Sequence, residues 1–153
     1  MKPKIFIDSN VLIDLATRRK NVEETQKLFA LIHLKEFEAF VSSSQITDVY
    51  YILSNGTLKL DQAKVIAFLK QILSEINIFP LSKTEIFSAL GANSKDFEDR
   101  CVFECAKCVK TDFIITSNIN DFKDFEIKCG DVIEFFSWLA KEKGLNYDII
   151  RKI

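Results

Sequence analysis

The sequence predicts an α/β fold in which a parallel sheet is covered by helices on both faces. Short apolar runs alternate along the chain with longer segments of helical periodicity, which is typical of sheets built from strand–helix–strand units. The chain has 153 residues, of which 48% are hydrophobic, enough to fill the core of one domain of ordinary size. We therefore expect one domain over residues 1–143 and a C-terminal tail over residues 144–153.

Four apolar runs have the length and composition of buried strands, and a fifth segment is expected to be extended. The strands are predicted at residues 4–8, 38–41, 77–80 and 113–116, with the extended piece at 126–128. Helical periodicity and capping residues predict helices at residues 9–15, 22–35, 45–53, 61–75, 83–91, 97–110 and 131–143. The tail carries apolar Ile149, Ile150 and Ile153 without an evident packing partner.

The formal net charge is −1, so the composition lacks the strongly basic balance that usually accompanies nucleic-acid binding. An RNA or DNA substrate is compatible with this charge only if metal ions, and not lysines alone, neutralise its phosphates. The N-terminal residues lead directly into the first strand, and no apolar run has the length of a membrane span. We expect a cytoplasmic protein with no membrane contact.

The four cysteines do not predict disulfides. Cys101, Cys105 and Cys108 follow one another at helical spacing and Cys129 stands apart, so we expect small buried apolar side chains. The alternative is an iron–sulfur site, because three cysteines so spaced resemble the radical-SAM motif, although the helical segment lacks the glycine of such loops. His33 lies among apolar residues of a helix and is expected to be a partly buried packing residue.

Two aspartates stand just after predicted strands. Asp8 closes the run at residues 4–7, and Asp121 follows the run at 113–116 after a short turn. The carboxyl ends of parallel strands gather at one crevice in an open sheet, so these two carboxylates can converge there. Crowded carboxylates repel each other unless a cation neutralises them, and oxygen ligands suit Mg²⁺ or Mn²⁺. The sequence therefore predicts a site for a hard divalent cation.

Four segments carry acidic residues in a recognisable order. They are Phe6–Leu12 with Asp8 and Asn10, Ser42–Tyr51 with Asp48, Asp96–Asp99, and Ile114–Phe122 with Thr116, Asn118 and Asp121. Together they resemble the PIN-domain nucleases, and especially the toxin-type, VapC-like PIN proteins of bacterial toxin–antitoxin pairs. The resemblance covers residues 4 to 139, and it depends on the ordered set because no single segment is specific.

The resemblance implies a Rossmann-like PIN domain with a central parallel sheet of four to five strands. It also implies an endoribonuclease that cleaves single-stranded RNA through a metal-activated water. The places of the four catalytic acids are occupied by Asp8, Asp48, Asp99 and Asp121. Three of these, Asp8, Asp99 and Asp121, are the ligands that we expect for Mg²⁺ or Mn²⁺.

Further polar residues are expected to support these acids. Asn10, Thr116 and Asn118 match the small polar residues that orient the site in the proteins resembled, and Asp96 is expected to cap the helix that carries Asp99. The resemblance implies an antitoxin protein as a partner and a homodimer as the assembly. The aromatic segment around Trp138 is expected to be either a core stripe or the exposed dimer interface.

Two positions depart from the pattern of the proteins resembled. Their second acid is usually a glutamate, so Asp48 is one methylene shorter and is expected to bind a metal through water. Ser117 stands where an arginine commonly follows the threonine, so a phosphate contact is missing there. The basic turn of Arg18, Arg19 and Lys20 supplies weak candidates for RNA contacts, with a solvated turn as the alternative.

Two other functions fit parts of the sequence. The segments around Asp8 and Thr116 are similar to the first two motifs of haloacid-dehalogenase-type phosphotransferases. That family needs an acid where Asn10 stands, because the acid protonates the leaving group. The second alternative is a catalytically inactive RNA- or protein-binding PIN module, since a fold does not determine a function.

Overall fold

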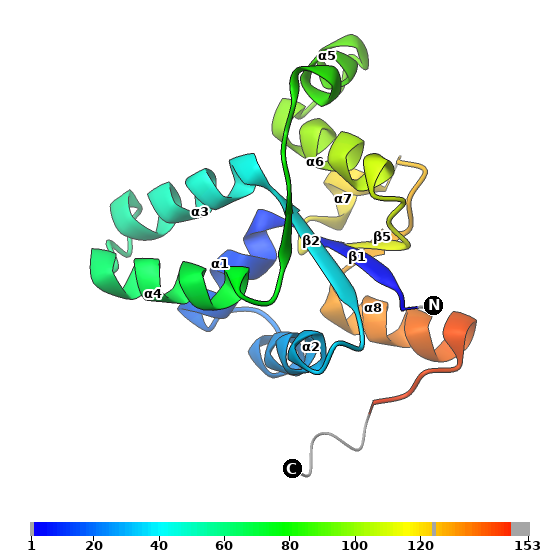
Figure 1. Ribbon diagram of the computed structural model, residues 1–153, viewed down its shortest axis with the longest axis horizontal. Helices are drawn as coiled ribbons and strands as arrows, with labels where there is room; N and C mark the ends of the chain where they lie inside the picture. Colours follow the sequence, from blue (N-terminus) through cyan, green and yellow to red (C-terminus); the bar gives the residue numbers. More distant parts are fainter. Residues whose placement is uncertain (1, 124, 148–153) are drawn as a thin grey trace.

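The computed structural model describes residues 2–123 and 125–147, and it contains a five-stranded sheet in the order β3-β2-β1-β4-β5 (Figure 1). The strands are β1 (Lys4–Ile7), β2 (Glu38–Ser42), β3 (Asn77–Phe79), β4 (Phe113–Ile115) and β5 (Cys129–Gly130). All four pairings are parallel, and Ile5 of the central strand lies opposite Ala39 on one side and Phe113 on the other. The predicted parallel sheet of four to five strands is confirmed.

Helices connect the strands and cover the sheet. They are α1 (Ser9–Thr17), α2 (Val22–His33), α3 (Ser43–Asn55), α4 (Gln62–Leu73), α5 (Lys83–Gly91), α6 (Phe97–Cys108), α7 (Ile119–Phe122) and α8 (Val132–Trp138), which continues as a π-helical turn over Leu139–Lys143. Gly144 ends that turn with a positive φ of 65°, a conformation that costs glycine little, as predicted for this stop. Within the described residues, no helix combines the length and the hydrophobicity of a membrane span.

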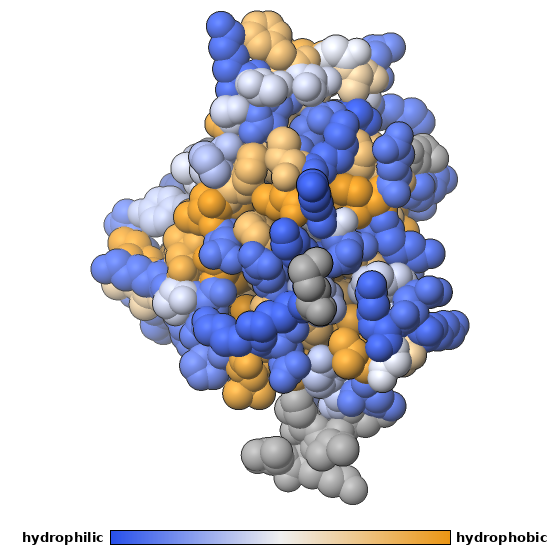
Figure 2. All heavy atoms as spheres, turned by 45° about the vertical axis from the view of Figure 1, so that its right-hand side comes forward, coloured by the Kyte–Doolittle hydropathy of each residue, from blue (hydrophilic) through white to orange (hydrophobic). Residues whose placement is uncertain are grey.

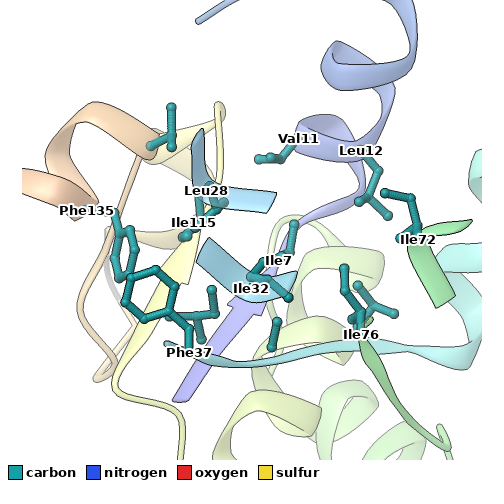
Figure 3. Packing of buried hydrophobic residues seen from close by; sticks show 14 of the residues in the cluster. Ile7, Val11, Leu12, Leu28, Ile32, Phe37, Ile72, Ile76, Ile115 and Phe135 are labelled. Atoms are coloured by element: carbon teal, nitrogen blue, oxygen red, sulfur yellow. The ribbon is translucent and has the colours of Figure 1, made fainter. Parts of the chain in front are cut away.

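Two hydrophobic clusters, one on each face of the sheet, explain why the strands are apolar throughout. Successive side chains of a strand point to opposite faces. Accordingly, Ile5 and Ile7 of β1 join a cluster with α1, α2, α3, α4 and α8, whereas Phe6 joins a second cluster with α6 and α7. Figure 3 shows the first cluster, in which Ile7 lies among side chains from α1 and α2. Burial on both faces is the condition under which parallel sheets are stable.

Three boundaries differ from the sequence-based expectation. The piece predicted to be extended at 126–128 is a bend up to residue 127, and the strand is β5, which begins at Cys129, just after the predicted piece ends. The Ile114 N–H donates to the Lys128 carbonyl at 2.8 Å, next to the start of this strand. A one-turn helix, α7, occupies a region expected to be a turn. The first tail residues do pack, since the Tyr147 ring lies 5.6 Å from Phe37 and its hydroxyl donates to Glu36. The tail isoleucines lie outside the described residues.

Two predictions about individual side chains were wrong. His33 is exposed, and its Nδ1 lies 2.7 Å from Oε1 of Glu75, an acid 42 positions further along the chain. Cys108 is exposed at the end of α6, whereas Cys101 and Cys105 are buried as expected and all four cysteines are free. For the segment around Trp138 the core alternative is confirmed, since Phe135 is fully buried and the Trp138 ring lies 5.2 Å from the Phe113 ring.

Exposed apolar side chains gather on other elements. Figure 2 shows hydrophobic side chains at the surface across the middle of one face, among hydrophilic ones. On α3, α5 and α6 the exposed members are Tyr51, Ile52, Phe87, Leu90 and Phe97. Helix α5 packs mainly on α6 and projects away from the sheet, whereas α6 lies against the sheet (Figure 1).

Candidate active site

The strand order reverses next to β1, and this reversal creates a crevice at the carboxyl edge of the sheet. From β1 the chain proceeds through β2 and β3 on one side, and β4 and β5 lie on the other. Ligands of open α/β sheets bind at such reversals. Asp8 directly follows β1 and Thr116 directly follows β4, and Asp8 N donates to the Ile115 carbonyl at 2.9 Å. Both side chains therefore enter the crevice from adjacent strands.

A hydrogen-bonded pair of buried side chains forms the centre of the site. The Thr116 hydroxyl donates to Oδ2 of Asp8 at 2.9 Å and accepts the Asn118 backbone N–H at 3.0 Å. Asn10 Nδ2 also donates to Oδ2 of Asp8, at 3.3 Å. Burial raises the pKa of Asp8, while the bonds from Thr116, the Ser9 backbone and Asn10 act against this rise. The carboxylate is thus held in one orientation.

Helix α6 adds the next carboxylate. Asp96 caps this helix as predicted, because its Oδ1 accepts the Asp99 N–H at 3.1 Å. The pKa of Asp99 is raised to about 7, first by burial and then by the negative charges of Asp8, Asp96 and Asp121, with a further contribution from a hydrogen bond to Asp121. Asp121 lies in the first turn of α7. Asp8, Asp99 and Asp121, from three distant segments, therefore form one electrostatically coupled group.

The fourth predicted acid, Asp48, is placed differently. It is exposed on α3 and lines a cavity of about 310 Å³ together with Asp8 and Asp99. Asp48 does not appear among the charges that raise the pKa of Asp8 or of Asp99. The four acids are thus divided into three coupled carboxylates and one that faces the same cavity from α3.

Gln45 organises the polar wall of this cavity, and its role was not predicted from the sequence. Its Nε2 donates to the Ile7 carbonyl at 2.8 Å and to the Ser9 hydroxyl at 3.2 Å, and its Oε1 accepts the Ser42 N–H at 2.7 Å. Gln45 therefore ties the start of α3 to the end of β1. The spacing Ser42-x-x-Gln45, typical of a capping box, is the signal that could have identified it.

The oxygen donors fit a hard divalent cation in chemistry. A bound cation would neutralise the negative charges whose mutual repulsion contributes to the raised pKa of Asp99. In the part of the chain that the structure describes, no three His, Cys, Asp or Glu side chains already lie close enough to hold a metal together. Mg²⁺ takes only one or two carboxylates directly and keeps several waters, so a closed set of three is not required.

The three basic residues of the α1–α2 turn are exposed, and each has different neighbours. Arg18 lines a groove with His33 and Glu75, and Arg19 Nε donates to the Thr17 hydroxyl at 3.0 Å. Lys20 lines a small cavity together with Thr116 and Ser117. Of the three, Lys20 is the one that shares a cavity with Thr116, the residue that donates to Asp8.

Known proteins resemble this chain in sequence and in fold. A family model described as PIN domain matches residues 4–120. Ribonuclease VapC1 of Aquifex aeolicus (strain VF5) is 32% identical over 110 residues, covering 68% of this chain and 74% of that protein. The crystal structure of VapC20 from Mycobacterium tuberculosis, a toxin that cleaves the sarcin–ricin loop, has a TM-score of 0.64 at 11% identity and covers 80% of this chain and 95% of its own. A toxin–antitoxin complex from Klebsiella pneumoniae has a TM-score of 0.58 at 20% identity, and the match covers 84% of this chain and 97% of the chain in that complex. At these identities the two structures establish a similarity of fold.

Proposed function

This chain belongs to the PIN domain family, and we propose that it is a metal-dependent endoribonuclease that cleaves single-stranded RNA. The observation that carries the proposal is the coupling of Asp8, Asp99 and Asp121 at the carboxyl edge of the sheet. The description of the Aquifex aeolicus relative as a ribonuclease supports it. The match to the PIN domain family argues against the haloacid-dehalogenase alternative. In addition, that family needs an acid at the position of Asn10, which here donates a hydrogen bond to Asp8.

Each residue of the site has a role in this proposal. Asp8, Asp99 and Asp121 would hold Mg²⁺ or Mn²⁺, partly through its waters, and the bound ion would supply a water of lowered pKa and neutralise charge on the phosphate. Thr116 and Asn10 orient the Asp8 carboxylate by donating to its Oδ2. Asp48, which lines the same cavity from α3, would contact the ion through one of its waters. Asp99, whose pKa is raised to about 7, would give up its proton when the cation binds.

The test compares two neutralising substitutions. Purified protein with Mn²⁺ is expected to cleave single-stranded RNA, and Asp8→Asn is expected to abolish cleavage while circular dichroism shows an unchanged fold. Asp61→Asn is the matched control, because Asp61 is exposed at the start of α4 and its side chain makes no capping hydrogen bond. Cleavage that survives Asp8→Asn would reject the site. An intact wild-type protein that never cleaves RNA would favour the inactive module.

We also propose that the protein is the toxin of a toxin–antitoxin pair, with an antitoxin protein as its partner and a homodimer as its assembly. The toxin and toxin–antitoxin structures with similar folds support the first part. Expression is expected to arrest growth, and the product of a neighbouring gene is expected to relieve the arrest. Light scattering of the purified protein is expected to give the molar mass of a homodimer. Harmless overexpression would contradict the toxin assignment.

A further inference from the structure

We propose that an apolar wall of the active-site cavity is a stacking platform for one unpaired nucleobase beside the scissile phosphate. The platform consists of Phe97 at the start of α6 and Ile52 on α3. This inference rests on the proposed ribonuclease function and deepens it, because it identifies what the cavity beside the acids receives.

The platform and the acids share the same cavity. The space of about 310 Å³ is lined by Asp8, Asp48 and Asp99 and also by Ile52 and Phe97. Phe97 is the first residue of α6, two positions before Asp99, and the Asp96 cap fixes this turn through its bond to the Asp99 N–H. An aromatic side chain and a metal-binding carboxylate are thus presented by a single turn of helix.

The exposure of these two side chains is not explained by packing. Phe97 is 44% exposed and Ile52 is 45% exposed, and neither belongs to the two core clusters of the described residues. Helix α6 is anchored without Phe97, since Val102, Phe103 and Cys105 are buried in the second cluster. Apolar surface left in water forgoes the stabilisation that burial supplies. Two such side chains lining a concave site beside catalytic groups point to a ligand that covers them.

The charge of the cavity favours a base over a phosphate. Among the described residues that line it there are four acids, Asp8, Asp48, Glu98 and Asp99, and no lysine or arginine. A phosphate would be repelled everywhere except at the metal, whereas a neutral base would not. Gln45 is already occupied by its own hydrogen bonds. The base is therefore held through stacking on its face. The only hydrogen bonds expected from the exposed carboxylates are those that they accept from exocyclic amino groups of the base.

Stacking on the platform requires an unpaired strand. Bases of a duplex are already covered on both faces, while bases of a single strand are free to lie on aromatic side chains. Every base has such a face, so the platform is expected to tolerate different sequences. The proposed preference for single-stranded RNA would then arise from Phe97 and Ile52, in addition to any effect of the acids.

The experiment measures cleavage kinetics of the Mn²⁺-loaded protein on a single-stranded RNA. Phe97→Ala is expected to lower kcat/KM about 5- to 150-fold, mainly through KM, the range expected for loss of one stacked base. Phe97→Trp is expected to retain activity. Phe87→Ala is the control, because Phe87 is 61% exposed on α5 and does not line the cavity. The urea midpoint of all three variants is expected to match the wild type.

A series of abasic substrates locates the stacked base. Each RNA carries one abasic ribose at a successive position around the cleaved bond. At one position the missing base is expected to lower kcat/KM of the wild type as much as the Phe97→Ala substitution does. The same abasic RNA is expected to cause no further decrease in kcat/KM of the Phe97→Ala variant.

Three results would overturn the inference, and they are distinguishable. Equal kcat/KM for wild type and Phe97→Ala would overturn it while leaving the ribonuclease function intact. Conversion of a dimer to a monomer by Phe97→Ala, seen by light scattering, would assign the surface to a second copy of the chain. A wild type that neither binds nor cleaves RNA would reject the proposed function itself.

Discussion

Replacement of Asp99 by asparagine tests the crowding of carboxylates directly. In the metal-free protein, the pKa of Asp99 is raised from 3.8 to about 7, so the folded state favours the protonated carboxyl. A raised pKa contributes stability that is fully present below pH 3.8 and is lost as the pH rises through 7. Asparagine resembles the protonated acid in shape, can donate to Asp121, and does not titrate. The variant should therefore keep at pH 8 the stability that the wild type loses.

The magnitude follows from the pKa and from the exposure of the group. At 1.36 kcal/mol for each pKa unit, the difference between 3.8 and about 7 corresponds to at most about 4 kcal/mol. Asp99 is only half-buried, and solvent screens such groups. We expect Asp99→Asn to raise the free energy of unfolding at pH 8 by about 1–2 kcal/mol and to leave it unchanged at pH 4.

The assay is urea unfolding in EDTA at both pH values, with Asp61→Asn as a control that carries the same change of charge on an exposed residue. Addition of Mn²⁺ at pH 8 should reverse the order, because an ion at 100 times its Kd stabilises the wild type by about 2.7 kcal/mol and the variant by less. An Asp99→Asn protein that is less stable than the wild type at pH 8 in EDTA would show that the carboxylates do not repel one another.

Three further predictions concern the site and the core. Thr116→Val should lower the free energy of unfolding by about 1–3 kcal/mol, because the Asn118 N–H loses its acceptor and Asp8 loses a donor; urea titration measures this, and Thr116→Ser should restore it. Asp48→Asn should lower the cleavage rate by about 10- to 100-fold, less than Asp8→Asn, because Asp48 acts through water; a loss equal to that of Asp8→Asn would assign Asp48 to the metal directly. Phe135→Ala should cost about 3–5 kcal/mol in urea unfolding because the ring is fully buried, and a cost below 1 kcal/mol would contradict its place in the core.

The fold and the convergence of the acids could be predicted because both follow from strand positions. Asp8 and Asp121 each follow a buried strand, and the parallel arrangement brings carboxyl ends together. Strand β5 could not be predicted because it has two residues and is defined by backbone pairing with β4, which no side-chain pattern reveals. The exposure of His33 depends on Glu75, a partner that periodicity within one helix cannot identify.

The polar and apolar walls of the cavity were harder to predict for a different reason. The sequence indicated Gln45 only as part of a helix start, since its partners Ile7 on β1 and Ser9 on α1 are 38 and 36 residues away. Phe97 has the chemistry of a core residue, and a pattern of apolar residues does not distinguish a buried phenylalanine from one that faces a cavity. Its position between Asp96 and Asp99 was the available signal.

The bond between Asp8 and Thr116 spans 108 residues, and this separation constrains when the acidic centre can exist during synthesis. A nascent chain that has emerged from the ribosome only as far as α6 already carries three of the four acids, but it lacks β4, the threonine hydroxyl and Asp121. Contacts this distant in sequence form late, after the entropy of closing the intervening loop has been overcome. Truncated translation products that end before residue 113 should therefore be inert, because they lack β4 and both the threonine hydroxyl and the acid that follow it.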